Sequence, residues 1–323
     1  MAMFTGLAGI KADNGGIMKL TVEFPSVAYR EGPAQVKKLA KAIEDIGFDH
    51  IDMFDHVLMG YPTATRQGPM YPPQMPILET LVLLSFAAAV TERVTLGSEV
   101  LILPQRQPTL VAKQISTLDT LSGGRVRLGV GSGWQASEYE ALNEDFGNRG
   151  KRMDEAIRLI RAYWTDAQID FNGEFYTANA MAMEPKSPQA GKLPIWIGGA
   201  APRALTRVAE LGDGWLATAI EDVSKATQLI ASIREQAAEF GRDPASIGMQ
   251  MMLDVPPRDA AGKRFYKDMD AVIGRAVAVS EAGFGWGSIN ATAIFQAGFR
   301  SVDALIDQLG VVHDAIRSEL GHS

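Results

Sequence analysis

The segment Leu118–Trp134 reads LDTLSGGRVRLGVGSGW, and it contains the repeating unit from which the fold can be inferred. It completes a helical pattern that starts at Thr109 and stops at Gly123-Gly124, because glycine is typical of helix C-termini. The run Arg125–Val130 then predicts a short buried strand, and Gly131–Gly133 a turn before the next helix. A helix, a strand and a turn in direct succession predict a β/α repeat with parallel strands.

The same unit recurs along the chain. The other predicted strands are Lys19–Phe24, Asp49–Phe54, Val94–Val100, Pro194–Ile197, Gly214–Ala217, Ile247–Leu253 and Gly285–Ile289. Eight strands that alternate with helices favour a (β/α)8 barrel over an open doubly wound sheet. An insertion is expected between strands four and five, over Thr165–Leu193, with a hairpin turn at Asn172-Gly173. We expect one domain over residues 18–323 and a mobile leader or tag over residues 1–17.

The composition excludes several classes of site and partner. The 323 residues include no cysteine, which rules out disulfides, thiolate zinc sites and a cysteine nucleophile. The formal net charge of −7 argues against nucleic acid and anionic membranes as partners, since both attract basic patches. No apolar stretch approaches the roughly 20 residues that span a bilayer. No histidines have metal-ligand spacing, so we expect no metal, and a cytoplasmic location is the default.

Functional residues of a barrel gather just after each strand. Glu23, Asp55, His56, Glu99 and Asp254 occupy such positions. His56 suits acid–base chemistry or a hydrogen bond to a cofactor ring, but it fits a structural histidine equally well. His50, at the other end of the same strand, is expected to be structural. A hydrolase would use Glu23, Glu99 and Asp254 as paired acids, which requires glycosidase spacing.

Two glycine loops are candidates for binding an anion. Gly198-Gly199 precedes Pro202, which favours a first helical position, so a phosphate could approach the bare helix N-terminus. Gly131-Ser132-Gly133 also precedes a short helix, but Trp134 breaks the dinucleotide fingerprint. Close packing of helix and strand would explain the glycines of either loop without a ligand. The long loop Val57–Met75 suits an apolar substrate lid, and two arginines on neighbouring loops could hold an anionic tail, Arg66 and Arg106.

The segment Leu118–Trp134 also resembles the bacterial-luciferase-like flavin and deazaflavin oxidoreductases. Further matches occur in the same order, namely Gly47–Asp49 with Asp55-His56, Leu103–Pro108 with Ala112–Gln114, Arg149–Arg152 with Asp154-Glu155, Asn172–Tyr176, Glu184-Pro185 and Pro194–Gly199 through Gly212–Trp215. The resemblance extends from Met18 to about Leu253 and is strongest to the branch that uses the deazaflavin coenzyme F-420. It fades from Asp254 onward.

The resemblance implies a barrel with a redox ring at its mouth. It places His56 beside the ring, with Asp55 to orient it, as the catalytic pair. It assigns cofactor contacts to these two residues and to Glu99, Val100, Gly131, Ser132, Gly133, Trp134, Gly198, Gly199 and Ala200. It also implies a cis peptide at Glu99-Val100. Family members that oxidise a sugar phosphate have glutamate at the position of Trp134, so that substrate is disfavoured.

The functional expectation is therefore an oxidoreductase that transfers hydride between coenzyme F-420 and a small, largely apolar organic substrate. The cofactor would supply the chemistry and the barrel its orientation. An FMN-dependent monooxygenase and a flavin-binding relative without catalysis remain alternatives. A homodimer is expected.

Overall fold

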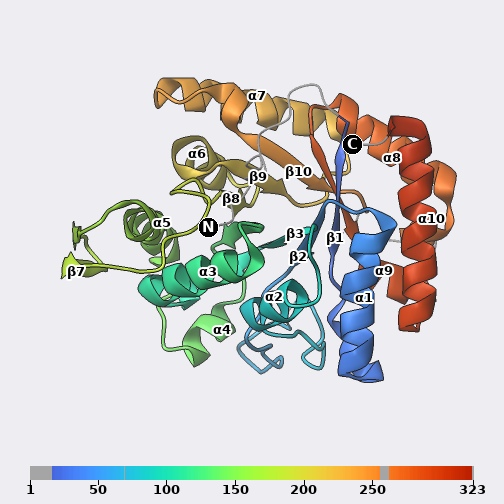
Figure 1. Ribbon diagram of the computed structural model, residues 1–323, viewed down its shortest axis with the longest axis horizontal. Helices are drawn as coiled ribbons and strands as arrows, with labels where there is room; N and C mark the ends of the chain where they lie inside the picture. The colour runs from blue at the N-terminus through green and yellow to red at the C-terminus, as the bar shows by residue number, and fades with distance from the viewer. Residues whose placement is uncertain (1–16, 69, 255–261, 322–323) are drawn as a thin grey trace, which may run out of the picture.

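The computed structural model describes residues 17–68, 70–254 and 262–321, which form a closed barrel of parallel strands surrounded by helices (Figure 1). The barrel strands are β1 (Lys19–Glu23), β2 (His50–Met53), β3 (Thr95–Ser98), β4 (Leu101–Ile102), β5 (Val126–Gly131), β8 (Ile195–Gly198), β9 (Gly214–Ala217), β10 (Gly248–Met252) and β11 (Trp286–Asn290). Both β3 and β4 pair with β5, which closes the sheet. They are two halves of one strand, so the described barrel has the predicted eight positions.

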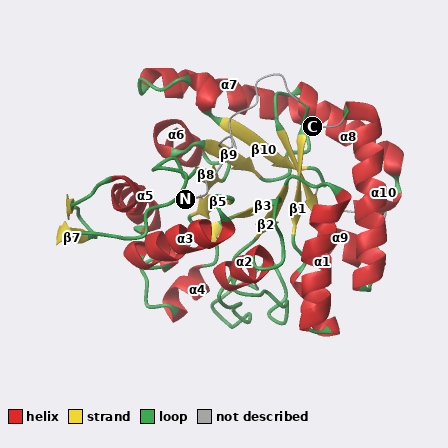
Figure 2. Cartoon of the chain, in the orientation of Figure 1, coloured by secondary structure: helices red, strands yellow, loops and turns green. Residues whose placement is uncertain are grey.

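The helices form a ring outside the strands (Figure 2). They are α1 (Pro33–Ile46), α2 (Thr80–Ala88), α3 (Pro108–Ser122), α4 (Ala136–Ala141), α5 (Arg149–Thr165), α6 (Pro202–Leu211), α7 (Val223–Glu239), α8 (Met269–Glu281), α9 (Ala291–Gln296) and α10 (Val302–Leu320), and short 3-10 turns cover Ser26–Glu31, Leu103–Gln105, Pro244–Ser246 and Gly262–Lys267. Gly47 ends α1 with a φ of 110°, a conformation that glycine adopts at little cost. None of the described helices is long and apolar enough to cross a membrane.

The predicted strands match the observed ones to within one residue at each end, apart from strand three. That strand was expected to be continuous over Val94–Val100, but it is interrupted between Ser98 and Leu101. Between α5 and β8 the chain forms an antiparallel pair, β6 (Ile169–Asn172) and β7 (Thr177–Met181), which projects from the barrel (Figure 1). The hairpin turn expected at Asn172-Gly173 is present, but it is longer than the tightest turns, because four residues connect the two strands. The proposed leader, residues 1–17, lies outside the described residues except for Ile17.

A charged layer fills the barrel interior. Arg127 is fully buried, and its guanidinium group donates to Asp52 Oδ2 over 2.7 Å. The guanidinium carbon lies 4.4 Å from the ring centre of Trp196 and 5.1 Å from that of Trp286. His50 Nε2 lies 2.9 Å from Asp52 Oδ1. Although burial opposes ionisation of Asp52, the charge of Arg127 holds its pKa below the ordinary value. The layer therefore closes the barrel below its mouth with paired charges.

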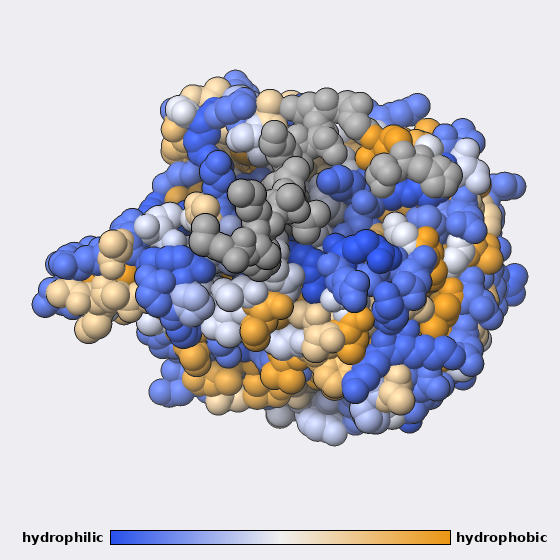
Figure 3. Space-filling model, viewed as in Figure 1, coloured by the Kyte–Doolittle hydropathy of each residue, from blue (hydrophilic) through white to orange (hydrophobic). Residues whose placement is uncertain are grey.

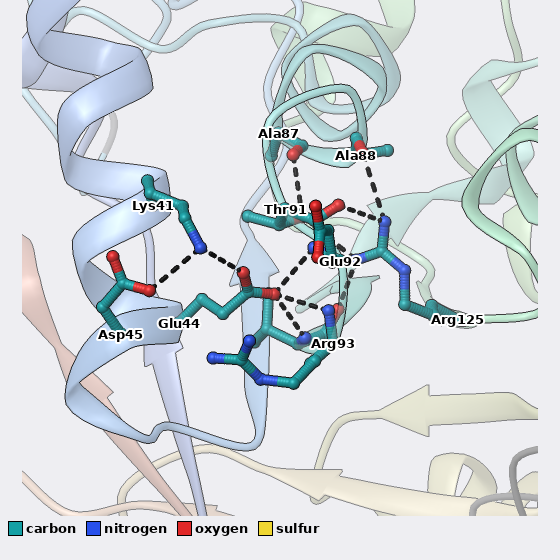
Figure 4. Close-up of polar contacts among 10 residues, drawn as sticks. Lys41, Glu44, Asp45, Ala87, Ala88, Thr91, Glu92, Arg93 and Arg125 are labelled. Carbon is teal, nitrogen blue, oxygen red and sulfur yellow. Dashed lines mark hydrogen bonds and ion pairs between the residues drawn. The ribbon is translucent and has the colours of Figure 1, made fainter.

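A second polar cluster lies at the end of the barrel where the strands begin. The Glu44 carboxylate on α1 accepts hydrogen bonds from the backbone N–H groups of Glu92, Arg93 and Val94, just before β3 (Figure 4). Its other oxygen accepts from Lys41 Nζ over 2.8 Å. Burial opposes ionisation, but these bonds outweigh it and lower the pKa of Glu44 to about 2. Glu44 thus fixes the α2–β3 connection to α1.

Arg125, which directly precedes β5, completes this cluster. Its guanidinium donates to the carbonyl oxygens of Ala88, Thr91 and Val94 over 3.2, 2.9 and 2.7 Å (Figure 4). Carbonyl groups at a helix C-terminus have no partners within the helix, so a buried arginine there satisfies groups that folding would otherwise leave unpaired. We call Glu44, Arg125 and the backbone groups they bind the base clamp.

Candidate active site

His56 lies just after β2 at the C-terminal end of the barrel and is 7% exposed. Its Nδ1 atom lies 2.9 Å from Oε2 of Glu138, which is fully buried on α4. The second oxygen of Glu138 accepts hydrogen bonds from the backbone N–H groups of Val57 and Leu58 over 2.6 and 3.3 Å. One carboxylate therefore fixes both the imidazole and the chain that follows it.

The charge of Glu138 determines how the imidazole is used. Burial works against ionisation of this carboxyl group, but the hydrogen bond and charge of His56 and the backbone N–H of Val57 lower its pKa below the ordinary value. An ionised carboxylate only accepts hydrogen bonds, so His56 donates its Nδ1 proton to it. The Nε2 atom is then the one that can accept or release a proton toward a bound molecule.

Two aromatic side chains pack against this imidazole, and a third packs against one of them. The ring of His56 lies 5.3 Å from that of Trp134 and 6.0 Å from that of Tyr71, both edge to face. Tyr71 also packs against Trp134 at 6.2 Å and against Phe54 at 6.4 Å. Trp134 is 39% exposed, so the group opens to solvent at one side. We call Phe54, Tyr71 and Trp134 the aromatic wall. Tyr71 comes from the segment after β2 and Trp134 from the segment after β5, as expected for a site at the C-terminal end of the barrel strands.

Asp55 was expected to orient His56, but the structure does not show this contact. No hydrogen bond joins Asp55 to His56 in the described part of the chain. Asp55 instead accepts from Arg106 over 2.7 Å, from the backbone N–H of Ile102 over 2.9 Å and from the Thr80 hydroxyl over 3.2 Å. Because these partners belong to β4, α2 and the loop before α3, Asp55 fixes the frame of the site. Glu138 takes the orienting role that had been expected of Asp55.

The cis peptide implied at Glu99-Val100 is present, between β3 and β4. The side chain of Val100 lies where three strands come close together. A Cβ atom added at Gly131 would lie 2.4 Å from Val100 Cγ2, and one at Gly198 would lie 2.7 Å from Val100 Cγ1. A Cβ atom at Gly129 would lie 1.8 Å from the carbonyl oxygen of Ser98. Packing around strand three therefore requires glycine at these positions, whether or not a cofactor binds above them.

The neighbouring turn residues also have structural partners. Gly133 has a φ of 64°, and a Cβ atom there would lie 2.7 Å from Ile102 Cγ2. The carbonyl oxygen of Ser132 accepts a hydrogen bond from Tyr139 Oη over 2.6 Å. These contacts hold the Gly131–Gly133 turn against β4 and α4, and Trp134 follows directly beside His56.

The second glycine loop remains open. Pro202 begins α6 as predicted, and the preceding Ala201 has no side-chain cap. Gly198 and Gly199 are half-buried and Ala200 is exposed, while the carbonyl oxygen of Gly199 accepts from Trp215 Nε1 over 2.8 Å. The N–H groups of the first helical turn thus have no side-chain partner, which is the arrangement of an anion site.

The two arginines suggested as anion holders are already paired. Arg66 donates to Glu140 over 2.8 Å. Arg106 contacts Asp55 and also Glu79, at 2.9 Å. Both positive charges are therefore balanced within the protein, and the open helix terminus at Pro202 is the better candidate for a phosphate.

Three carboxyl groups line the barrel mouth on other strands. Asp254 follows β10 and accepts from Tyr266 Oη over 2.8 Å, while Glu99 accepts from the Ser288 hydroxyl over 2.8 Å. Burial raises the pKa of Asp254 to about 6 and that of Glu99 to about 8, with the charge of Asp52 also raising the latter. Glu23, at the end of β1, has its pKa raised by burial and by the charges of the other two. We call Glu23, Glu99 and Asp254 the mouth carboxyls.

Glu138 and Tyr71 were missed by the sequence analysis. Glu138 lies 82 positions from His56 along the chain. The only available signal was its place directly after the Gly131–Trp134 turn, on a short helix at the functional end of the barrel. Tyr71 was considered only as one apolar residue of the Val57–Met75 loop.

Comparisons with known proteins agree with this geometry. A sequence model of the luciferase-like monooxygenase family matches residues 14–279. An uncharacterized protein of Mycobacterium tuberculosis is 37% identical over 212 residues, which cover 63% of this chain and 72% of that protein. The F-420-dependent glucose-6-phosphate dehydrogenase of Nocardia farcinica is 30% identical over 243 residues, which cover 73% and 68% of the two chains.

Solved structures share the fold. An F-420-dependent secondary alcohol dehydrogenase, solved in complex with an F-420–acetone adduct, superposes with a TM-score of 0.75 at 20% identity and covers 94% of this chain and 100% of that one. The F-420-dependent tetrahydromethanopterin reductase of Methanopyrus kandleri gives a TM-score of 0.69 at 17% identity, with coverages of 92% and 98%. Since the family sequence model covers most of its length, this chain belongs to the luciferase-like monooxygenase family.

Proposed function

We propose that this protein is an oxidoreductase that transfers hydride between coenzyme F-420 and a small organic substrate at the mouth of the barrel. The observation that carries the proposal is the His56–Glu138 pair, which presents an orientated imidazole beside the aromatic wall at the functional end of the barrel. Two of the compared proteins with this fold or sequence are named as F-420-dependent dehydrogenases, which supports this cofactor.

The open loop and the aromatic wall fit such a cofactor. Gly198, Gly199 and Ala200 would hold its phosphate at the N-terminus of α6, since no side chain caps that terminus. Val100 and the Gly131–Gly133 turn would support the ring from below. When bound, a deazaflavin ring exchanges a hydride with a substrate carbon and is poorly suited to oxygen activation.

The protein's own contribution is to position the substrate and to move a proton. His56 Nε2 would take the proton from a substrate hydroxyl as its carbon is oxidised, or return it in the opposite direction. Glu138 would stabilise the imidazolium formed in that step, because it is held ionised next to Nδ1. Tyr71 and Trp134 would exclude water from the reacting atoms.

The other readings are less well supported. FMN in the same pocket would support monooxygenation, and the riboflavin lyase structure with modified FMN among the compared folds keeps that alternative open. A flavin-binding protein without catalysis would not need Glu138 to orientate His56. The mouth carboxyls form a cluster that a hydrolase could use, but a hydrolase would have no role for the His56–Glu138 pair.

The test is to titrate the protein with F-420 and, separately, with FMN, and to monitor binding by fluorescence. F-420 is expected to bind more tightly. Gly199 has a φ of 119°, so a side chain there would strain the backbone. Ala200→Asp avoids this strain and is the sharper test. It should weaken F-420 binding at least tenfold, because it places a negative charge at the helix N-terminus. Gly274→Asp, in open space on α8, is the control of equal charge. Equal affinity of parent and Ala200→Asp protein would show that the phosphate lies elsewhere.

We also propose that the protein is a homodimer. Apolar residues gather on the surface over α2 and α3 (Figure 3), where Val82, Leu110 and Leu121 are 68%, 58% and 79% exposed. Large apolar side chains exposed on two neighbouring helices favour a protein–protein interface. Sedimentation of the parent and of Leu110→Lys protein tests this, and a monomeric parent would contradict it.

A further inference from the structure

Glu23 is a buried carboxyl group without a partner. It is 7% exposed, and within the described part of the chain its side chain has no hydrogen bond or ion pair. Its carboxyl oxygens are not fully buried, so they are open to solvent at the barrel mouth, where a ligand can pair with them.

The strand pattern shows where Glu23 points. Thr21, two residues earlier on β1, donates to Gln250 Oε1 inside the barrel. Side chains two residues apart on a strand share a face, so Glu23 also points into the barrel, one step nearer the mouth.

Asp254, just beyond β10, accepts from the Tyr266 hydroxyl, and that hydroxyl accepts from the backbone N–H of Asn290, the register partner of Glu23 on β11. Glu99 accepts from Ser288, two residues earlier on β11, so the three carboxyls gather around the end of this strand. Charge repulsion from Glu99 and Asp254 adds to the effect of burial in raising the pKa of Glu23.

The aromatic wall adjoins these carboxyls. Phe54 lies two residues beyond Asp52, the register partner of Glu23 on β2, and its ring centre is 6.4 Å from that of Tyr71. Burial, together with the charges of Glu23 and Asp254, raises the pKa of Tyr71. The same ring packs against Trp134 and Phe54. Acidic groups and aromatic faces together are the two elements with which proteins bind organic ammonium groups.

We propose that the mouth carboxyls and the aromatic wall form a subsite for an ammonium group of the substrate. The inference rests on the proposed function and refines its substrate to a small molecule with an apolar body and a cationic amine. The aromatic rings beside the carboxyls favour an organic cation, because aromatic faces attract ammonium groups. An entering ammonium group would pair with Glu23 and allow more than one of the carboxyls to ionise.

Two arginines near the subsite have other partners. Arg127 is engaged by Asp52, and Arg275 donates to backbone carbonyl groups. Burial raises the pKa values of Glu99 and Asp254 and outweighs the lowering effect of the Arg127 and Arg275 charges.

The ionisable groups that face the carboxyls from the surrounding elements are His50, Asp52, Tyr71, Arg127, Tyr266 and Arg275. Because the pKa of Glu99 is about 8 and that of Asp254 about 6, cation binding should release protons and become tighter between pH 6 and pH 8.

The experiment compares choline with its neutral isostere 3,3-dimethyl-1-butanol by calorimetry on the full-length protein, with and without F-420. We expect choline to bind at least tenfold more tightly at pH 8, with an affinity that falls toward pH 6. The neutral alcohol should show no such pH dependence. Choline does not titrate, so the pH dependence reports the protein groups alone. Equal affinities for the two probes, or no choline binding in either state, would overturn the inference.

Variants locate the site. Glu23→Gln and Asp254→Asn should each weaken choline binding at least fivefold and leave the neutral alcohol unaffected, whereas Asp307→Asn, which removes the same charge from the exposed face of α10, should change neither. Choline binding that survives both substitutions would contradict the assignment. If choline binds as expected but F-420 does not, the subsite stands and the proposed function fails, so the two failures are distinguishable.

Discussion

The two ends of the barrel use the same side chain in opposite ways. Glu44 in the base clamp is 3% exposed and Glu23 at the mouth is 7% exposed, so burial does not distinguish them. Glu44 accepts three backbone N–H groups and pairs with Lys41, and its pKa is lowered to about 2. Among the described residues Glu23 has no hydrogen-bond partner, and its pKa is raised by burial. The carboxylate at the base is fully paired and stabilises the fold, whereas Glu23 at the mouth is unpaired, as the proposed subsite requires.

The largest expected effect is at the base. Glu44→Ala should lower the free energy of unfolding by about 3–5 kcal/mol, because it leaves the three backbone N–H groups before β3 without their acceptor. Urea denaturation measures this change. Asp45→Ala is the matched control, since Asp45 binds the same lysine from an exposed position, and it should cost less than about 0.5 kcal/mol. Similar losses in both variants would show that the backbone hydrogen bonds of Glu44 do not stabilise the fold more than an exposed ion pair does.

The next effect is on turnover at the mouth. His56→Ala should lower turnover at least about 10²-fold, about 2.7 kcal/mol of transition-state stabilisation, with cofactor affinity changed less than about tenfold. The measurement is turnover normalised to cofactor-loaded protein, together with a melting curve. His313→Gln, on α10, should leave turnover unchanged. If His56→Ala lowers the melting point but not turnover, His56 belongs to the scaffold like Glu44.

Glu138→Gln tests the positioning of His56 and should lower turnover about tenfold. The glutamine amide can donate to Nδ1, which would move the imidazole proton to Nε2. Nitrogen-15 NMR of the ring distinguishes the two tautomers, and a purely structural role would not change them. An unaltered tautomer with unaltered turnover would remove Glu138 from the site.

The last effect is on stability at the mouth, and it depends on pH. Asp254→Asn should raise the free energy of unfolding by up to about 3 kcal/mol at pH 8, because it removes the penalty for ionising this buried carboxyl group. The folded pKa of Asp254 is about 6 and its ordinary value is 3.8, so the penalty for ionising it is absent below pH 3.8 and complete above pH 6. The gain should therefore vanish near pH 4. For Glu44 the sign is opposite, because its stabilising contribution is lost as the pH falls from 4.5 through 2. A gain from Asp254→Asn that is independent of pH would contradict this assignment.

The barrel could be predicted because its signals are local. Each strand and each helix is encoded by a short hydrophobic period and by a glycine or proline at its boundary, such as Gly47 or Pro202. His56 could be predicted as a candidate because it follows a strand.

The partners of these residues could not be predicted, because contacts across the barrel leave no local pattern. Glu138 reaches His56 from another unit, and Glu99 meets Ser288 from the far end of the chain. The break in strand three was accessible only through the resemblance. Glu44 lies next to Ile43 in the predicted apolar face of α1 and looks like an ordinary surface residue in sequence.

The close packing of Gly129, Gly131 and Gly198 against strand three has a consequence for the evolvability of this pocket. No side chain can be introduced at these positions without displacing Ser98 or Val100, so these three positions are closed to adaptive change. New specificities must arise at the rim. A directed-evolution library should therefore keep the three glycines fixed and place its diversity at Tyr71, Trp134 and the neighbouring residues of the Val57–Gly68 loop.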